Sequence, residues 1–92
     1  MLFEWDERKA AQNLAKHGVR FEHAARIFSD APRVDAEDTR RDYREKRRSA
    51  IGLIEGRIYV VVYTVRGETV RLISARMANA RERRRYYEAI ST

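Results

Sequence analysis

The sequence predicts an α+β fold in which a short N-terminal strand and two helices pack on an antiparallel sheet and a last helix follows. Three observations predict it: helix formers between good capping residues in the first third, apolar stretches separated by glycine turns over 49–76, and a capping box just after them. With 92 residues, the chain makes one domain, 1–92, with a single modest core.

The first element is a short strand. Leu2–Trp5 alternates apolar and polar residues, which favours a strand that adds to the edge of a sheet. Asp6 then suits the N-cap of a helix over Glu7–His17, and Gly18 suits its end.

A second amphipathic helix is predicted ahead of Pro32, which closes it. Its apolar residues recur at helical spacing and are Phe21, Ala24, Ala25 and Phe28. The stretch Arg33–Arg48 is polar, charged and weakly patterned, so we expect a loop or an irregular strand there.

Three antiparallel strands are predicted next. Ser49–Ile54, Arg57–Val65 and Glu68–Arg76 are separated by two-residue turns at Glu55–Gly56 and Arg66–Gly67, each with glycine second. Asn79 and Glu82 then have the spacing of a capping box and predict the start of the last helix.

The hairpin register sorts the strand residues onto two faces. One face is nearly all apolar, and we expect the N-terminal helices to pack on it. The other carries Tyr59, Tyr63, Arg57 and Arg76 among apolar residues, and we expect a partly open groove there. The members of the first face are Ser49, Ile51, Leu53, Ile58, Val60, Val62, Thr64, Thr69, Arg71, Ile73 and Ala75.

Arg71 is the exception in this scheme. A regular strand places it opposite Val62 on the helix-covered face, where an ion pair to Asp6, Glu22 or another carboxylate would hold it. A β-bulge would instead turn it outward.

The charge distribution suits a polyanion. The formal net charge is +6, and basic residues gather in Arg40–Arg48 and in Arg81–Glu88. Nucleic acid is the first partner to expect, and an acidic protein is the alternative.

Several classes of site are not expected. The chain has no cysteine, which excludes disulfides, thiol nucleophiles and cysteine zinc sites. The carboxylates Asp35, Glu37 and Asp38 lie on a polar loop, so we expect neither a catalytic metal nor a cofactor. No stretch is long and apolar enough for a signal peptide or a membrane helix, so we expect a cytoplasmic protein with no membrane partner.

Taken together, several segments resemble the BrnT family of bacterial type II toxins. They follow one another in the family's order over nearly the whole chain. They are Phe3–Asp6, Lys16–Gly18 with Phe21, Ile51–Gly52, Val60–Thr64, Arg71–Arg76, and Arg81–Arg83 with Tyr86.

This resemblance implies a RelE-like fold and an RNA-cleaving activity that blocks translation. It also implies a BrnA-like antitoxin with a ribbon-helix-helix domain, and a toxin–antitoxin complex that represses its own operon by binding operator DNA. Two other functions stay open at this point: a non-catalytic module that binds nucleic acid or protein, and a topoisomerase poison like the ParE relatives of the same fold.

For RNA cleavage without metal, Arg76 is the first candidate, because a guanidinium at a strand end can stabilise the charged phosphate. A strand-end ion pair is the alternative. His17 has a suitable pKa for proton transfer and lies beside Lys16, although a histidine there can simply cap the helix. Tyr63 is a base only if nearby cations lower its pKa, and Arg71 completes the catalytic set.

The remaining candidates are expected to bind RNA. Aromatic rings stack on bases, although packing in the core is the alternative for each ring. Exposed arginines bind phosphate or, on the last helix, meet the antitoxin. These RNA-binding candidates are Trp5, Arg47, Arg57, Arg81, Arg84 and Tyr86.

Overall fold

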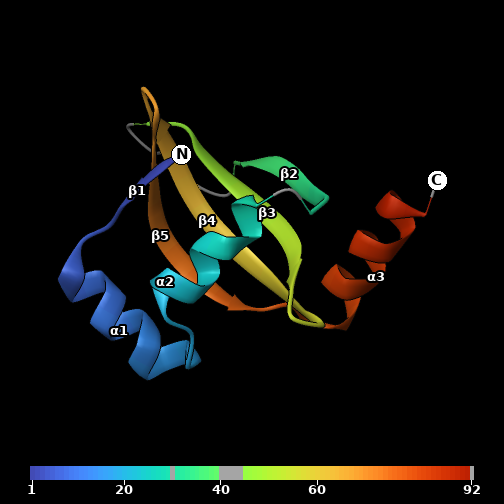
Figure 1. Cartoon of the computed structure of the whole chain (residues 1–92). Coiled ribbons are helices and arrows are strands. Elements are labelled where there is room, and N and C mark those ends of the chain that lie inside the picture. Colours follow the sequence, from blue (N-terminus) through green and yellow to red (C-terminus); the bar gives the residue numbers. More distant parts are fainter. Residues whose placement is uncertain (30, 40–44, 92) are drawn as a thin grey trace.

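The computed structural model describes residues 1–29, 31–39 and 45–91. Its elements are β1 (Leu2–Glu4), α1 (Glu7–His17), α2 (Phe21–Ala24), the 3₁₀ helix η1 (Ala25–Phe28), β2 (Arg33–Asp38), β3 (Arg47–Ile54), β4 (Arg57–Arg66), β5 (Thr69–Met77) and α3 (Ala80–Ile90). The strands form one sheet in the order β1-β5-β4-β3-β2, in which β1 is parallel to β5 and the other neighbours are antiparallel. Figure 1 shows α2 in front of the strands, α1 beside the lower end of β5 and α3 beside β3. The predicted α+β architecture is confirmed.

Helix α1 begins and ends where the sequence predicts. Asp6 Oδ1 accepts hydrogen bonds from the backbone N–H groups of Arg8, at 2.8 Å, and Lys9, at 3.1 Å. Both bonds lower the pKa of Asp6, and the bond from Lys9 has the larger effect. Gly18 ends the helix with a φ of +70°, and its N–H donates to the carbonyl of Leu14 at 2.9 Å.

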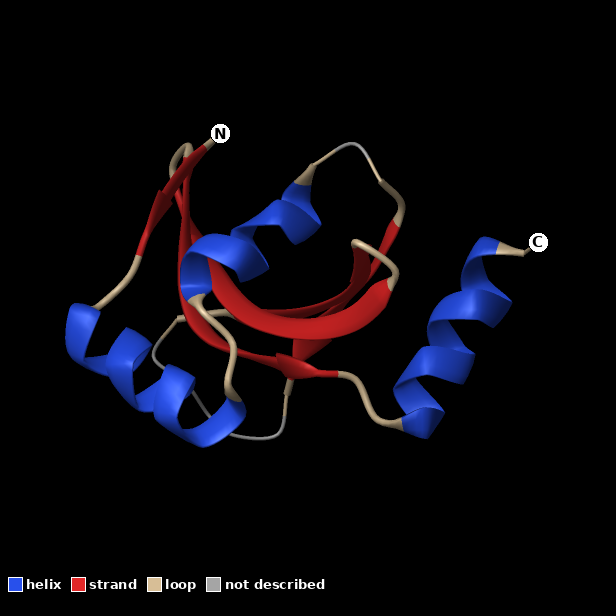
Figure 2. Cartoon of the chain, turned by 60° about the horizontal axis from the view of Figure 1, so that its bottom comes forward, coloured by secondary structure: helices blue, strands red, loops and turns tan. Residues whose placement is uncertain are grey.

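The second helix lies where it is predicted, but its second half is tighter. One turn of α-helix, α2, continues directly as the 3₁₀ helix η1. Figure 2 shows the sheet curving around this segment. Ile27 approaches the sheet closely at Gly52, where an added Cβ would lie 2.3 Å from Cγ1 of Ile27. Glycine is therefore required at that point for the helix to reach the sheet.

Strand β2 is more regular than the sequence predicts. It pairs with β3 from Arg33 opposite Gly52 to Asp38 opposite Arg47. An edge strand of this kind depends on backbone bonding, and its charged side chains conceal the alternation that identifies other strands. Residues 40–44 of the predicted basic stretch lie outside the described residues.

The first hairpin is confirmed, and the second is shifted by one residue. Ile54 pairs with Arg57, which leaves Glu55–Gly56 as the turn. In the second hairpin Arg66 pairs with Thr69, so the turn is Gly67–Glu68 and not the predicted Arg66–Gly67. Gly67 takes a φ of +60° as the first turn residue, a position that also favours glycine.

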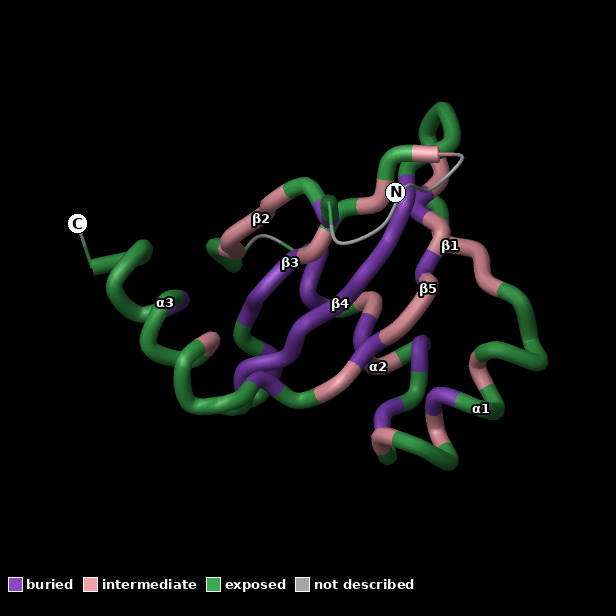
Figure 3. The backbone as a smooth tube through the Cα atoms, turned by 180° about the vertical axis from the view of Figure 1, so that it is seen from behind, coloured by how far each residue is buried: buried purple, intermediate pink, exposed green. Residues whose placement is uncertain are grey.

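The prediction of which face of the sheet the N-terminal helices cover is wrong. Helices α2 and η1 pack on the face with Tyr59, Val61, Tyr63 and Leu72, whereas Tyr86 of α3 packs on the other face. The second cluster consists of Ile51, Ile58, Val60, Ala78 and Tyr86, with Val34 packed against it. Figure 3 shows that most residues of β4, the central strand, are buried. Both of its faces are apolar, so alternation alone did not indicate which face the N-terminal helices cover.

A β-bulge in β5 changes which side chains share a face. Val62 pairs with Ser74 and Tyr63 with Leu72, so Ile73 is the extra residue between them. Arg71 and Arg76 lie an odd number of positions apart, and a regular strand would point them to opposite faces. Because of the bulge, both lie on the face opposite α2. The predicted pairing of Arg71 with Val62 is wrong, since its partner is Thr64.

Helix α3 starts at the predicted capping box. Glu82 N–H donates to Oδ1 of Asn79, and Asn79 N–H donates to Oε1 of Glu82, both at 2.9 Å. The helix packs against β2 and β3. Across the described parts of the chain, no helix combines the length and the apolar character needed to cross a membrane.

Asn13 joins α1 to the open edge of β5. Strand β1 pairs with Thr69–Arg71 only, so farther along this edge β5 needs another partner. Asn13 Nδ2 donates to the carbonyl of Ala75 at 2.9 Å, and Asn13 Oδ1 accepts from the N–H of Ala75 at 3.0 Å. Nδ2 also donates to the carbonyl of Val19 at 3.0 Å. The buried amide thus takes the place of a neighbouring strand's peptide group.

Replacing Asn13 with alanine is expected to lower the free energy of unfolding by about 2–4 kcal/mol, because one N–H and two carbonyl groups would lose their partner in a buried place. Urea unfolding measures the change. Gln12→Ala, at the exposed neighbouring position, is the control and is expected to change stability little. A loss for Asn13→Ala no larger than the control's would contradict the structural role of the amide.

Candidate active site

A hollow of about 550 Å³ lies on the face of the sheet opposite α2. Strands β3, β4 and β5 form its floor, and the end of α1, strand β2 and the first turns of α3 form its walls. The floor residues are Ser49, Ile51, Val60, Val62, Ser74 and Arg76. The wall residues include Lys16, His17, Ala36, Glu37, Asp38, Thr39, Glu82 and Arg85.

His17 reaches the hollow because Asn13 holds α1 against β5. The two residues are one helical turn apart and therefore lie on the same side of α1. A smaller hollow of about 260 Å³, lined by both residues and by Ser74, adjoins the first. Burial, and then the positive charges of Lys16 and Arg76, lower the pKa of His17 from its usual 6.5. The imidazole is therefore neutral at pH 7 and able to accept a proton.

Arg76 lies at the end of β5, on the floor of the hollow. Its Nη1 and Nη2 donate to Oε1 and Oε2 of Glu82, both at 2.7 Å. Its Nη1 is also 3.4 Å from the carbonyl oxygen of Met77. The strand-end ion pair considered as the alternative is thus present. A guanidinium has five N–H donors, so the pair with Glu82 and contact with a phosphate are compatible.

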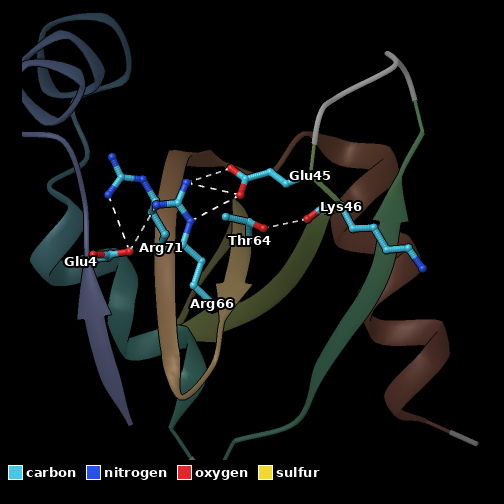
Figure 4. A network of polar contacts seen from close by, with 6 residues as sticks. All are labelled: Glu4, Glu45, Lys46, Thr64, Arg66 and Arg71. Atoms are coloured by element: carbon cyan, nitrogen blue, oxygen red, sulfur yellow. Dashed lines mark hydrogen bonds and ion pairs between the residues drawn. The ribbon is translucent and has the colours of Figure 1, made fainter.

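Arg71 lies near the start of β5, on the same face as Arg76, in an ion-pair network (Figure 4). Its Nη1 is 3.7 Å from Oε1 of Glu4, and Nη1 of Arg66 is 3.9 Å from the same oxygen. Arg66 also pairs with Glu45 at 3.3 Å. The expectation of an ion pair with a carboxylate is therefore confirmed, with Glu4 as the partner.

Tyr63 does not lie with Arg76, and the prediction that they share a face is wrong. The bulge in β5 places Arg76 on the side opposite the tyrosine, which packs edge-on against Phe28 at 4.8 Å between ring centroids. Its hydroxyl donates to Asp35 of β2. Burial, and then the bond to Asp35, raise the pKa of Tyr63, although a hydrogen bond with Arg48 acts the other way. A raised pKa makes the phenol a poorer base.

Two other aromatic candidates also have packing roles. Trp5 lies edge-on to Phe21 at 5.9 Å and belongs to the core under α2, away from the hollow. Tyr86 is 1% exposed, and its hydroxyl donates to the carbonyl of Pro32 at 3.1 Å. The core-packing alternative holds for both rings.

The remaining predicted arginines are spread over the molecule. Arg57 is exposed at the β3–β4 hairpin, Arg47 begins β3, and Arg81 and Arg84 are exposed on α3. Arg85, which was not predicted, lines the hollow. The structure therefore brings His17, Lys16 and Arg76 together in the hollow. The four predicted arginines are not among the residues that line it.

A family comparison identifies the kind of protein to which this site belongs. The family model for the ribonuclease toxin BrnT of type II toxin–antitoxin systems matches residues 5–82. The chain belongs to the BrnT family. The resemblance predicted from the sequence is confirmed, and the family is one of ribonuclease toxins. No individual curated protein matches the chain.

The matched range of this BrnT chain includes His17, Arg76 and Glu82. Sequence reasoning did not assign Asn13 or Glu82 to the site. Asn13 is four residues before His17, a spacing that places them on one helix face, and Glu82 was assigned to the capping box alone.

Within the described ranges, no group of three or more histidine and acidic side chains is arranged to hold a metal ion.

Tyr63→Phe is expected to lower stability by about 1–3 kcal/mol while leaving RNA cleavage per folded molecule unchanged, because it removes a hydrogen bond to a carboxylate on the far side of the sheet. Urea unfolding and cleavage of a labelled RNA test the two parts. Loss of cleavage with unchanged stability would return Tyr63 to the catalytic set.

Proposed function

We propose that this BrnT toxin cleaves RNA without a metal ion, with His17 as the proton acceptor and Arg76 as the group that stabilises the phosphate. One observation carries the proposal: the end of α1 and the end of β5 bring these two side chains into one hollow, where the charge of Arg76 helps to keep His17 neutral. A proton acceptor and a phosphate-binding cation side by side are what such a reaction needs.

RNA supplies its own nucleophile. In the proposed reaction His17 accepts the proton of a 2′-hydroxyl, and the 2′-oxygen attacks the neighbouring phosphorus. The bond from phosphorus to the 5′-oxygen breaks, and that oxygen takes a proton from water. The hydroxide that remains takes the proton held by His17, which restores the neutral imidazole. The products are a 2′,3′-cyclic phosphate and a 5′-hydroxyl. Arg76 and Lys16 stabilise the negative charge that builds up on the phosphate oxygens.

The β-bulge supports a path for the RNA along β5. It places Arg71 on the same face as Arg76, so one strand offers two guanidinium groups to successive parts of the backbone. Arg85 adds a cation from α3. In this arrangement Arg71 binds the RNA backbone and Arg76 binds the phosphate at which the chain is cut.

The partner in this proposal is a BrnA-like antitoxin with a ribbon-helix-helix domain. The family belongs to type II toxin–antitoxin systems, which pair a toxin with an antitoxin. The exposed arginines of α3 offer a surface for an acidic segment of that partner. The complex of the two represses its own operon through the antitoxin's contact with operator DNA, and the free toxin blocks translation in the cytoplasm. Co-purification with the product of the neighbouring reading frame tests the pairing, and a mobility shift of operator DNA tests repression.

Arg76→Ala is expected to lower the rate of RNA cleavage by about 100- to 1,000-fold, because it removes a preorganised donor from the charged phosphate. Growth arrest on induction should be lost, while binding to the antitoxin persists. Cleavage of a labelled RNA by the toxin separated from its antitoxin measures the rate.

Arg8→Ala, at an exposed position on α1, is the matched control and should cut RNA like the wild type. Wild-type cleavage should also continue in excess EDTA, since no step uses a metal. A fully active Arg76→Ala variant would refute the assignment of Arg76. Binding of RNA without any cleavage by the wild type would favour a non-catalytic module.

The rate should depend on pH through His17. A general base works in its neutral form, so kcat/KM is expected to fall as pH drops through the lowered pKa of His17, with a midpoint below 6.5 and a level region above it. His17→Gln should abolish this acid limb along with most of the activity. His23→Gln, which changes the histidine that packs beside Tyr59 on the other face, should keep it. An unchanged acid limb in His17→Gln would assign the base to another group.

A further inference from the structure

We propose that Glu82 is a positioning residue for RNA cleavage, because its carboxylate sets the orientation of the Arg76 guanidinium in the hollow. The inference rests on the proposed function, in which Arg76 binds the phosphate. It assigns Glu82 a second role besides capping α3, and it makes the start of that helix part of the catalytic apparatus.

The contacts of the carboxylate carry the first step. Both of its oxygens engage Arg76, in two parallel hydrogen bonds of 2.7 Å that join the Nη1–Nη2 edge of the guanidinium. A bidentate pair of this kind fixes the plane and the direction of the guanidinium as well as its distance. The carboxylate is 20% exposed, so water competes little for its oxygens.

The second step is that Glu82 is itself held in place. Its Oε1 accepts the N–H of Asn79 at 2.9 Å, and its own N–H donates to the side chain of Asn79. The N-terminus of α3 favours a negative charge at this position. Tyr86, one turn later, is buried against the sheet and anchors the helix.

These contacts form a chain from the core to the proposed catalytic arginine. Buried Tyr86 docks α3, the capping box sets the carboxylate at the start of the helix, and the carboxylate sets Arg76. A guanidinium whose direction is set before RNA arrives needs no reorganisation during the reaction. If Glu82 were only a counter-ion, RNA would have to displace it from Arg76, and the carboxylate would slow cleavage.

Glu82→Gln separates positioning from capping. Glutamine also suits this position of a capping box, and its side-chain oxygen is able to accept the N–H of Asn79. Its amide NH₂ would face the donor Nη2 of Arg76, so the bidentate grip is lost. We expect kcat for RNA cleavage to fall on the order of 10- to 100-fold, with a smaller change in KM. The urea midpoint is expected to fall modestly, because the ion pair and the charge at the start of α3 are lost, so kcat is measured on protein that is fully folded under the assay conditions. Glu88→Gln, the same change on an exposed part of α3, is the control and should keep the kcat of the wild type.

A double-mutant cycle tests whether Glu82 acts through Arg76. Arg76→Lys keeps a charge but not the planar fork, so Glu82→Gln is expected to change kcat by about twofold or less in that background. An equal loss in both backgrounds, or a Glu82→Gln variant as fast as or faster than the wild type, would overturn the positioning role alone. A wild-type protein that cuts no RNA would overturn the proposed function itself, so the two failures are distinguishable.

Discussion

The arrangement of the hollow depends on the side-chain amide of Asn13. Strand β5 continues well beyond the short β1, and its edge there would expose backbone groups inside the protein. Asn13 satisfies both the N–H and the carbonyl of Ala75 and adds a bond to Val19, the first residue after the turn that follows α1. Three hydrogen bonds from one amide thus set the angle and depth at which α1 meets the sheet. His17, one turn farther on, reaches the hollow as a result.

The bulge at Ile73 is the second constraint, because it decides which side chains meet. Without it, Arg71 and Arg76 would lie on opposite faces of β5. One extra residue in a strand leaves the sequence pattern nearly unchanged, and for that reason the register derived from the turns placed Tyr63 beside Arg76. The displaced second turn, Gly67–Glu68, added to the error in pairing. Register is a property of two strands together, and a glycine near a turn indicates its position only to within one residue.

Local signals predicted the fold's elements well. The caps of α1, the first hairpin and the capping box of α3 each depend on a few neighbouring residues, and all are confirmed. The face on which α2 packs depends on contacts between distant segments, and a central strand with apolar residues on both sides does not distinguish them. The same division holds for the site. His17 and Arg76 were candidates from their residue type and their place in the sequence. Asn13 and Glu82 were not, because they looked like an ordinary helix residue and an ordinary cap.

The hollow lies on the face of the smaller apolar cluster, where Ile51 and Val60 give way to polar side chains. One cluster holds α2 against the sheet, and the other, smaller one holds α3 through Tyr86. The two proposed catalytic side chains are only partly buried, and apolar packing alone would leave such side chains several rotamers. Each is placed instead through a directional polar contact: Asn13 sets the helix that carries His17, and Glu82 sets Arg76 directly. Hydrogen bonds with fixed geometry orient a partly exposed side chain and leave it accessible. A site that admits a chain of RNA requires side chains that are both oriented and accessible.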